Sequence, residues 1–375
     1  MAVNPDKLNA FMGTAVGDIG AALSANMVLL GDKLGLYKAM VKAGPVTPAE
    51  LAKATHTTER YVCEWLGNQA AGGYVTDDAG TGRYRLPEEQ AMALADESSP
   101  CFLPGAFQVI AATFSANPKI KQRFKAGKGL GGDQHDHRLF EGTKRFFRPN
   151  YLDNLVANWI PSLDGVEDKL KGGATVADIG CGFGASTLIM AKAYPTSTFI
   201  SFDYHKPSLL TAHKRAKEAG LKNVTFTTAT STNYPGKEYD FVAHFDCLHD
   251  LGDPVGAAKH VKKTLAQNGT WMIVEPFANN RVEDNLNPVG RVFYAASTMI
   301  CVPAPWRTMA RPSVPKQERR GCERWSGKAG SHDSVARRRR RSTWCRKADR
   351  ETQTNTTAGL APGPNAACAL SRLRA

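Results

Sequence analysis

The sequence of 375 residues has room for about two domains, and its formal net charge is +13. The excess positive charge lies in residues 302–375, which hold 17 Lys and Arg against 5 Asp and Glu, whereas residues 1–301 are almost neutral. This distribution argues against a nucleic-acid-binding body. The start of the chain has no basic run before an apolar core, and the apolar stretch 21–30 is too short to span a bilayer. We therefore predict a cytoplasmic protein with no membrane segment.

The eight cysteines form no Cys-x-x-Cys pair and show no other spacing typical of metal ligands. We interpret them as reduced, structural thiols, and we predict no metal site. His135-Asp136-His137 follows a glycine-rich stretch but has no further ligands at a suitable spacing. A position in a loop or at the rim of a pocket is therefore the favoured interpretation of that tripeptide.

The first predicted element is a helix over residues 6–30, in which small residues alternate with apolar ones. The small residues are Gly13, Gly17, Gly20 and Ala21. A face of small residues permits close contact between helices. Two interpretations remain open, a dimer-forming helix and an ordinary helix within the domain.

Residues 32–86 have the pattern of a winged helix-turn-helix. Helices are predicted over 32–42, 51–54 and 57–70, and strands over 74–76 and 83–86 flank a turn that forms the wing. Thr47-Pro48-Ala49-Glu50 is a capping box with proline at the first helical position, so it predicts the start of the second helix.

The predicted recognition helix argues against DNA as a partner. Its one cation, Arg60, is opposed by Glu64, and the wing carries Asp77 and Asp78, which repel phosphate. We therefore expect no nucleic-acid partner. A DNA-binding transcriptional regulator that uses a cofactor domain as a sensor remains the alternative function.

Residues 100–151 have an interrupted helical pattern that is rich in aromatic side chains. We expect most of these rings to pack in a core. A segment between a cofactor domain and a dimerisation domain is also a place where a substrate pocket is lined. This segment is therefore predicted as a helical linker that lines the substrate.

The chain is organised around residues 175–191, a short apolar run that breaks into alternating glycines and resumes as a helix. The pattern predicts a buried strand, a tight turn and a helix start, where glycines with positive φ bring bare N–H groups to a nucleotide-type ligand. Gly180, Gly182 and Ala185 also satisfy the dinucleotide pattern, so a nicotinamide oxidoreductase stays open as another interpretation. Asp178 favours S-adenosylmethionine, because a carboxylate suits its ammonium group and repels a pyrophosphate.

Further buried strands over 198–202, 223–227, 239–245 and 270–276 alternate with helices, which predicts a doubly wound parallel sheet. Asp203 ends the second strand, where a carboxylate for ribose hydroxyls is expected with either cofactor. The fourth strand leads into Asp246-Cys247-Leu248-His249-Asp250, at an edge of the sheet where substrate chemistry is placed. The loop and helix predicted over 281–300 would cap an acceptor pocket through Phe293 and Tyr294.

The motif Asp178-Ile179-Gly180-Cys181-Gly182-Phe183-Gly184 closely resembles the first motif of the class I S-adenosylmethionine-dependent methyltransferases. The two-domain layout resembles that of bacterial winged-helix methyltransferases that act on oxygen atoms of small molecules. The resemblance covers about residues 1–301. It implies a dimerisation-type domain over 1–99, the linker over 100–151 and a cofactor-binding domain over 152–301.

The same resemblance implies the site residues. Those expected to bind S-adenosylmethionine are Asp178, Gly180, Cys181, Gly182, Gly184, Asp203, Tyr204, Thr230 and Asp246. His249 and its neighbour Asp250 are the expected catalytic residues, because the segment Leu248-His249-Asp250 is similar to one whose histidine deprotonates the acceptor hydroxyl. A histidine that only packs near the cofactor remains the alternative. The expected partners are a small-molecule methyl acceptor and a second copy of the chain.

Residues 302–375 depart from the resemblance. They contain an arginine run, Arg337 to Arg341, three of the six tryptophans, and no sustained helix or strand periodicity. We therefore predict an α/β fold, a Rossmann-like doubly wound sheet behind a mostly α-helical winged-helix domain, in which the last strands of the sheet are missing. Out-of-frame translation of a GC-rich gene is our favoured explanation of this basic segment, and a genuine basic tail is the alternative.

Overall fold

The computed structural model describes residues 3–131, 134–303 and, for the backbone, 368–374. The chain forms two compact units, Met1–Asn117 with His135–Asn150 and Pro118–Gln134 with Tyr151–Ala375. It crosses between them three times, once between Gln134 and His135 and twice inside helices, α6 (Pro104–Ala126) and α7 (His137–Asn154), each with an interior proline next to the crossing. The segment predicted as a linker therefore contributes to both units.

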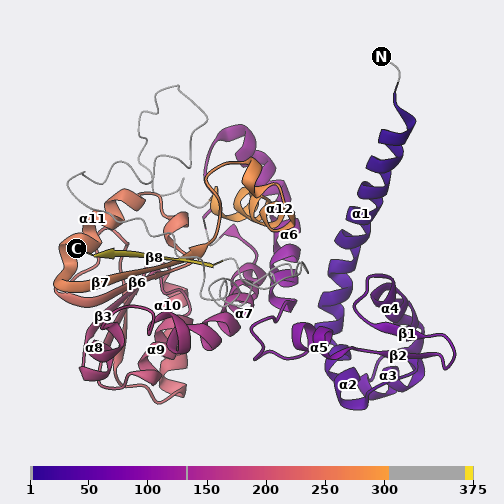
Figure 1. The fold of residues 1–375 in the computed structure, drawn as a ribbon, viewed down its shortest axis with the longest axis horizontal. Coiled ribbons are helices and arrows are strands. Elements are labelled where there is room, and N and C mark those ends of the chain that lie inside the picture. The colour runs from indigo at the N-terminus through magenta and orange to yellow at the C-terminus, as the bar shows by residue number, and fades with distance from the viewer. Residues whose placement is uncertain (1–2, 132–133, 304–367, 375) are drawn as a thin grey trace, which may run out of the picture. The chain divides into compact units, whose positions relative to one another are not determined.

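The first unit contains the predicted winged helix-turn-helix (Figure 1). Its elements are α1 (Pro5–Lys33), α2 (Leu36–Ala43), α3 (Pro48–Thr55), α4 (Glu59–Ala71), β1 (Thr76–Asp78), β2 (Arg83–Arg85) and α5 (Glu88–Leu94). The capping box is confirmed, because the Thr47 side chain accepts from the Glu50 N–H and the Glu50 carboxylate accepts from the Thr47 N–H. Strands β1 and β2 pair antiparallel as the wing.

Helix α1 is 29 residues long, and only its carboxyl end packs into the core of this unit. Ala25, Val28 and Leu29 are buried there, and the Trp65 indole N–H donates to the Met27 carbonyl at 2.8 Å. This helix is long and apolar enough to cross a membrane, whereas the apolar stretch 21–30 noted in the sequence is too short. Core helices can have the same length and composition, so these two properties do not distinguish a membrane span from a core helix.

The second unit is built on a six-stranded sheet of order β5-β4-β3-β6-β7-β8. Its strands are β3 (Thr175–Ile179), β4 (Thr198–Asp203), β5 (Val224–Thr228), β6 (Tyr239–Phe245), β7 (Leu265–Pro276) and β8 (Cys368–Arg374). Strands β3 to β7 run parallel, as the buried apolar runs predicted, so the Rossmann-like fold class is confirmed. The helices of this unit are α8 (Val166–Gly172), α9 (Ala185–Ala193), α10 (Lys206–Glu218), α11 (Pro254–Thr264) and α12 (Pro288–Ala296).

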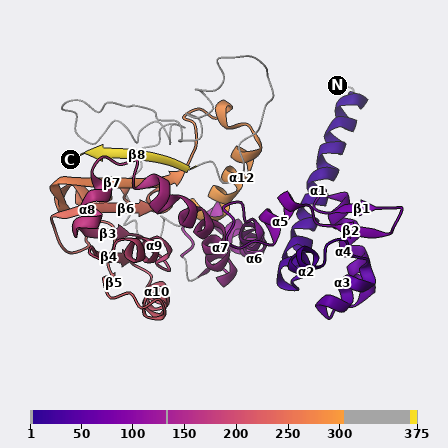
Figure 2. The same ribbon diagram turned by 60° about the horizontal axis from the view of Figure 1, so that its bottom comes forward.

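Strand β8 corrects the prediction that nothing follows β7 in the sheet. Its backbone pairs antiparallel with β7 from Thr270 to Pro276, and Figure 2 shows it along that edge. The pairing satisfies backbone groups of β7 that an open edge would expose. The sequence concealed the strand, because Ser371 and two arginines interrupt its apolar residues. The arginine run and the proposed frame change over 304–367 lie outside the described residues.

Candidate functional site

The predicted site residues come together at the carboxyl edge of the parallel sheet. The loop after β3, the end of β4, the turn after β6 and the end of β7 all lie at this edge, because the four strands run in the same direction. Strands β4 and β6 flank β3 on opposite sides, so the chain order changes direction at β3. Such a switch point is where ligands bind in doubly wound sheets.

The glycines after β3 are needed for close packing. Gly180, Gly182 and Gly184 have φ of 73°, 51° and 76°, which is the left-handed region. A Cβ atom on Gly180 would lie 2.7 Å from the Cys247 sulfur, and one on Gly184 would lie 3.0 Å from the Phe226 ring. A Cβ atom on Gly182 would meet nothing within 4 Å, so this glycine faces open space.

The expectation of bare N–H groups in this loop is wrong for four residues. The N–H groups of Gly180 and Cys181 donate to the Phe202 carbonyl, and that of Gly184 donates to the Cys181 carbonyl. The Gly182 N–H donates to Asp203 Oδ2 at 2.9 Å. Three of these donors therefore bind the loop to β4 and the fourth closes the loop on itself, which is compatible with a ligand other than a phosphate.

Asp178 is buried within β3, with 1% of its surface exposed. Its Oδ2 accepts from the Ser186 hydroxyl at 2.8 Å and the Thr187 hydroxyl at 2.6 Å, which ties β3 to the first turn of α9. Its Oδ1 is buried and has no hydrogen-bond partner among the described residues. Burial raises the pKa of Asp178 to about 6, although the two hydroxyl hydrogen bonds lower it. A buried oxygen without a donor suits a cationic group, which would favour the ionised carboxylate.

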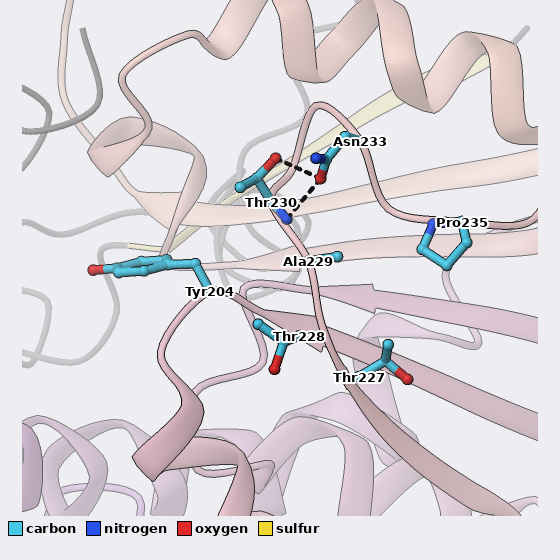
Figure 3. A pocket seen from close by; sticks show the side chains of 7 residues that line it. All are labelled: Tyr204, Thr227, Thr228, Ala229, Thr230, Asn233 and Pro235. Atoms are coloured by element: carbon cyan, nitrogen blue, oxygen red, sulfur yellow. Dashed lines mark hydrogen bonds between the residues drawn. The ribbon is translucent and has the colours of Figure 1, made fainter.

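Asp203 ends β4, and the next residue, Tyr204, lines a cavity of about 450 Å³ (Figure 3). Its Oδ1 accepts from the His205 N–H at 2.8 Å, and burial raises its pKa. The cavity is lined by Tyr204, Thr227, Thr228, Ala229, Thr230, Asn233 and Pro235. Thr230 is fixed there, because its N–H and its hydroxyl both donate to Asn233 Oδ1, at 3.0 and 2.7 Å. The volume lies in the range of small-ligand pockets.

Asp246 follows β6 in a left-handed conformation, with φ of 49°. Its Oδ2 accepts from the Tyr151 hydroxyl, and its Oδ1 is a second buried carboxylate oxygen without a partner among the described residues. Burial raises the pKa of Asp246 to about 7, while the Tyr151 hydroxyl lowers it. The next residue, Cys247, is partly buried against the glycine loop, and its thiol donates to the Ile179 carbonyl at 3.2 Å.

His249 lies in a short 3-10 turn, η3 (Leu248–Asp250), and is held by the end of β7. Its Nδ1 is hydrogen-bonded to Glu275 Oε2, and Glu275 Oε1 accepts from the Leu248 N–H at 2.7 Å. Its Nε2 lies 3.2 Å from Asp250 Oδ1. Burial lowers the pKa of His249, but the Cys301 thiol and the carboxylates of Glu275 and Asp250 raise it to about 11. The imidazole therefore holds a proton firmly.

Sequence reasoning missed three residues of this site. Tyr151 and Cys301 are far from the motifs along the chain, and no local pattern marks them. Glu275 lies in a Glu-Pro exit from the fifth predicted strand, where its position at the carboxyl edge was the available signal.

The recognition helix of the first unit offers little to DNA. The Arg60 guanidinium is paired with Glu64, one turn along α4. Asp78 in the wing accepts from the Thr81 hydroxyl at 2.6 Å and the Gly80 N–H at 3.0 Å, and these hydrogen bonds lower its pKa. The wing therefore keeps an exposed negative charge.

Comparison with protein families identifies two domains in the chain. Residues 21–96 match the Rv2258c-like winged HTH domain, and residues 170–311 match a methyltransferase domain. The second match begins just before β3 and includes the glycine loop, Asp203, His249 and Glu275.

Individual relatives are similar over parts of the chain. A tRNA (guanine-N(7)-)-methyltransferase of Shewanella halifaxensis is 43% identical over 63 residues, which are 17% of this chain and 27% of that protein. The chain spans between 21% and 65% of the length of the curated relatives it matches. The mitomycin 7-O-methyltransferase has the same fold, with a TM-score of 0.60, 17% identity and coverage of 80% of this chain and 88% of that one. Human N-acetylserotonin methyltransferase, solved with S-adenosylmethionine, gives a TM-score of 0.55, 15% identity and coverage of 80% and 88%.

Proposed function

We propose that this chain, which carries a winged helix-turn-helix domain and a class I methyltransferase domain, transfers a methyl group from S-adenosylmethionine to a hydroxyl group of a small molecule. The observation that carries the proposal is the position of His249 at the carboxyl edge of the sheet, with Glu275 on its Nδ1. Its Nε2 lies 3.2 Å from Asp250 Oδ1 and is the ring atom that we assign to the acceptor.

Two buried carboxylates and the cavity beside Tyr204 fit the cofactor. Asp178 Oδ1 and Asp246 Oδ1 lack hydrogen-bond partners among the described residues, and each suits a positively charged part of S-adenosylmethionine. Asp203, Tyr204 and Thr230 are the residues proposed for the adenosine portion. When bound, S-adenosylmethionine supplies a methyl group on a sulfonium sulfur, and its displacement by an oxyanion mainly requires alignment.

His249 faces the acceptor as an imidazolium. Because its pKa is about 11, the ring is already protonated at neutral pH and does not take a proton from a phenol, whose pKa is about 10. The phenol's proton leaves to a base in solution, and the imidazolium stabilises the phenolate whose oxygen attacks the methyl carbon. Asp250 and Glu275 stabilise the imidazolium by their charge.

Calorimetric titration of the full chain with S-adenosylhomocysteine tests the cofactor site, and transfer of labelled methyl from S-adenosylmethionine to a panel of phenols tests the reaction. We expect one binding site and methylation of at least one phenol, with turnover reduced about 10²-fold in His249→Ala. His56→Asn is the control, because His56 is exposed in the first unit and asparagine tolerates its left-handed φ of 53°. Absence of S-adenosylhomocysteine binding by folded protein would overturn the proposal.

Transfer RNA is a second acceptor to be tested, because several curated relatives are named as tRNA (guanine-N(7)-)-methyltransferases. Unfractionated tRNA therefore belongs in the same assay. Label in 7-methylguanine and none in phenols would replace the small-molecule acceptor with RNA. The near-neutral charge of residues 1–301 favours the small molecule.

The amino-terminal part of α1 is proposed as the contact between two copies of the chain. Its large apolar side chains are exposed, and they are Leu8, Phe11, Met12, Val16, Ile19 and Leu23. A membrane span fits this helix less well, because Asp18 lies within the apolar stretch and a carboxylate at the bilayer centre costs about 2.5–3.5 kcal/mol. The packed carboxyl end of α1 would also have to leave its core. We accordingly expect the protein in the cytoplasm.

Sedimentation equilibrium tests this contact. The wild type is expected to be a dimer, and Phe11→Glu with Ile19→Glu is expected to be a monomer with the same thermal unfolding of the methyltransferase domain. Tyr61→Glu, at an exposed position on α4, is the control that keeps the dimer. A dimer that survives the α1 substitutions would contradict the assignment.

A further inference from the structure

Three different metal-ligating groups converge beside the sheet edge. His249 and Asp250 lie in η3, and Cys301 ends a short π-helical turn, η5 (Ser297–Cys301), after α12. One ligand atom of each residue, an imidazole nitrogen, a carboxylate oxygen and the thiol sulfur, lies within 4.8 Å of the other two. The three residues come from two separate segments, so the cluster is a product of the fold.

The separations suit a single small ion. His249 Nε2 and Asp250 Oδ1 are 3.2 Å apart. Two ligands bound to zinc at about 2.0–2.2 Å in a tetrahedron are separated by about 3.3 Å, and the edges to sulfur are slightly longer. The nitrogen and the oxygen are therefore already spaced as two corners of a zinc tetrahedron.

Asp250 offers a buried carboxylate oxygen to a metal ion. Its Oδ1 has no hydrogen bond among the described residues, although Nε2 is only 3.2 Å away. The two atoms approach without the alignment that a hydrogen bond requires. The charge of the imidazolium offsets part of the cost of burying this oxygen, and a metal ion that replaces the proton would bind the oxygen directly.

Glu275 provides an independent sign of a metal ligand. It binds Nδ1 of His249 and thereby fixes the ring with Nε2 toward Asp250 and Cys301. Histidines that bind zinc usually donate their other ring N–H to a carboxylate or a carbonyl in this way, because the partner fixes the tautomer and strengthens the ligand.

We propose that His249 Nε2, Asp250 Oδ1 and Cys301 Sγ form a binding site for a divalent transition-metal ion, with zinc as the best fit. An imidazole, a thiolate and a carboxylate together suit zinc, whereas magnesium and calcium require oxygen ligands. Three protein ligands leave the fourth tetrahedral position open. The sequence predicted no metal site, because residues 249, 250 and 301 do not have the spacing of a metal motif.

One consequence rests on the proposed function. Zinc binds Nε2 by displacing the proton that the imidazolium holds there, so the metal ion and the acceptor compete for this position. Zinc at this site therefore inhibits methyl transfer, and a chelator restores activity.

The site is tested on the full chain after treatment with a chelator, by titrating Zn²⁺ against a chromophoric competitor and by adding Co²⁺. We expect one Zn²⁺ bound with a Kd below about 1 μM and a thiolate-to-cobalt charge-transfer band. Cys301→Ser should abolish the band and weaken Zn²⁺ binding about 100-fold, and Asp250→Asn and Glu275→Gln should weaken it about 10-fold or more. Cys101→Ser, an exposed cysteine of the other unit, should change neither measurement.

Thermal unfolding and S-adenosylhomocysteine binding are measured for every variant, so a misfolded variant is distinguished from one that has lost only the metal site. Because the chain has eight cysteines, zinc binding that is equally tight in Cys301→Ser and Asp250→Asn would overturn the site. Zinc binding without S-adenosylhomocysteine binding would leave the metal site standing and overturn the methyltransferase proposal. S-adenosylhomocysteine binding without zinc binding would overturn the metal site and leave the methyltransferase proposal standing.

Discussion

The Cys247 sulfur occupies the space that a side chain on Gly180 would need. A Cβ atom on Gly180 would lie 2.7 Å from that sulfur, and the backbone of Gly180 has a positive φ of 73°. Gly180→Ala should therefore lower the free energy of unfolding by about 2–4 kcal/mol, from strain in the left-handed region together with the clash. Urea unfolding followed by circular dichroism measures this loss.

The variant Gly182→Ala tests whether the glycine loop contacts the ligand, with little effect on protein packing. Its φ is also positive, at 51°, but its Cβ atom would meet no protein atom within 4 Å. We expect a loss of only about 1 kcal/mol in stability and a fall of about 10-fold or more in affinity for S-adenosylhomocysteine, measured by calorimetry. Unchanged affinity in this variant would show that the open face of the loop is not a ligand contact.

The buried carboxyl of Asp246 predicts a specific pH dependence of stability. Its pKa is raised from 3.8 to about 7 by burial in the fold. A group with a raised pKa binds a proton more tightly in the folded state, so its contribution to stability is complete below pH 4 and is lost as the pH rises toward 7. The wild type should therefore lose on the order of 4 kcal/mol between pH 4 and 8 relative to Asp246→Asn, which has no such group.

Parallel urea titrations of the two proteins at several pH values measure this difference, and other titrating groups cancel in the comparison. The side-chain amide oxygen in the Asp246→Asn variant can still accept the hydrogen bond from Tyr151. Asp253→Asn is unsuitable as a control because Asp253 caps α11, so the exposed Asp77→Asn serves instead. A pH-independent difference between wild type and Asp246→Asn would contradict the raised pKa.

The ion pair between Arg145 and Asp32 joins α7 to α1 inside the first unit. Arg145 donates two hydrogen bonds to the Asp32 carboxylate, at 2.7 and 2.9 Å, and only 8% of the Asp32 side chain is exposed. Arg145→Met leaves this carboxylate without its cation, so the free energy of unfolding is expected to fall by about 3–5 kcal/mol. In a double-mutant cycle, adding Asp32→Asn should recover part of this lost stability.

The control for this cycle is the exposed pair of Arg60 and Glu64, whose side chains are 75% and 70% exposed. Arg60→Met should change the free energy of unfolding by less than about 1 kcal/mol. Equal losses in the two arginine variants would show that burial does not make the inner pair different.

The strands and the edge where the site lies could be predicted because they are local properties of the sequence. Parallel strands buried on both faces read as apolar runs, and β3, β4 and β6 begin within one residue of their predicted positions. The glycine loop, Asp203 and His249 then fall at one edge, since parallel strands share their direction. The beginning of β7 at Leu265 was missed, because Asn268 and Gly269 are typical of a turn.

The contacts that tune the site could not be predicted, because they join distant parts of the chain. Tyr151 reaches Asp246 from the end of α7, and Cys301 reaches His249 from beyond α12. No local sequence pattern indicates that these residues lie close together in the fold. The unpartnered oxygens of Asp178, Asp246 and Asp250 are likewise properties of burial, which a single sequence does not display.

Glu275 gives a final prediction, because its carboxylate stabilises His249 as an imidazolium. Its Oε1 accepts from the Leu248 N–H, so in Glu275→Gln the amide oxygen is expected to keep that bond and the NH₂ group to face Nδ1. Nδ1 must then accept, so the ring is expected to become neutral with its one proton on Nε2, and the positive charge that stabilises the phenolate is lost. Turnover on a phenol that the wild type methylates should fall about 10²-fold. The affinity for S-adenosylhomocysteine should change by less than about 3-fold.

Nitrogen-15 chemical shifts of the labelled imidazole report the tautomer directly, and the loss of the carboxylate also lowers the pKa of His249 from about 11. Glu283→Gln is the matched control, since Glu283 is 56% exposed and pairs with Arg281 away from η3. If Glu275→Gln kept its turnover although its imidazole became neutral, the charge of the imidazolium could not be part of the reaction. If turnover fell while the ring stayed an imidazolium, Glu275 would not act through the protonation of His249.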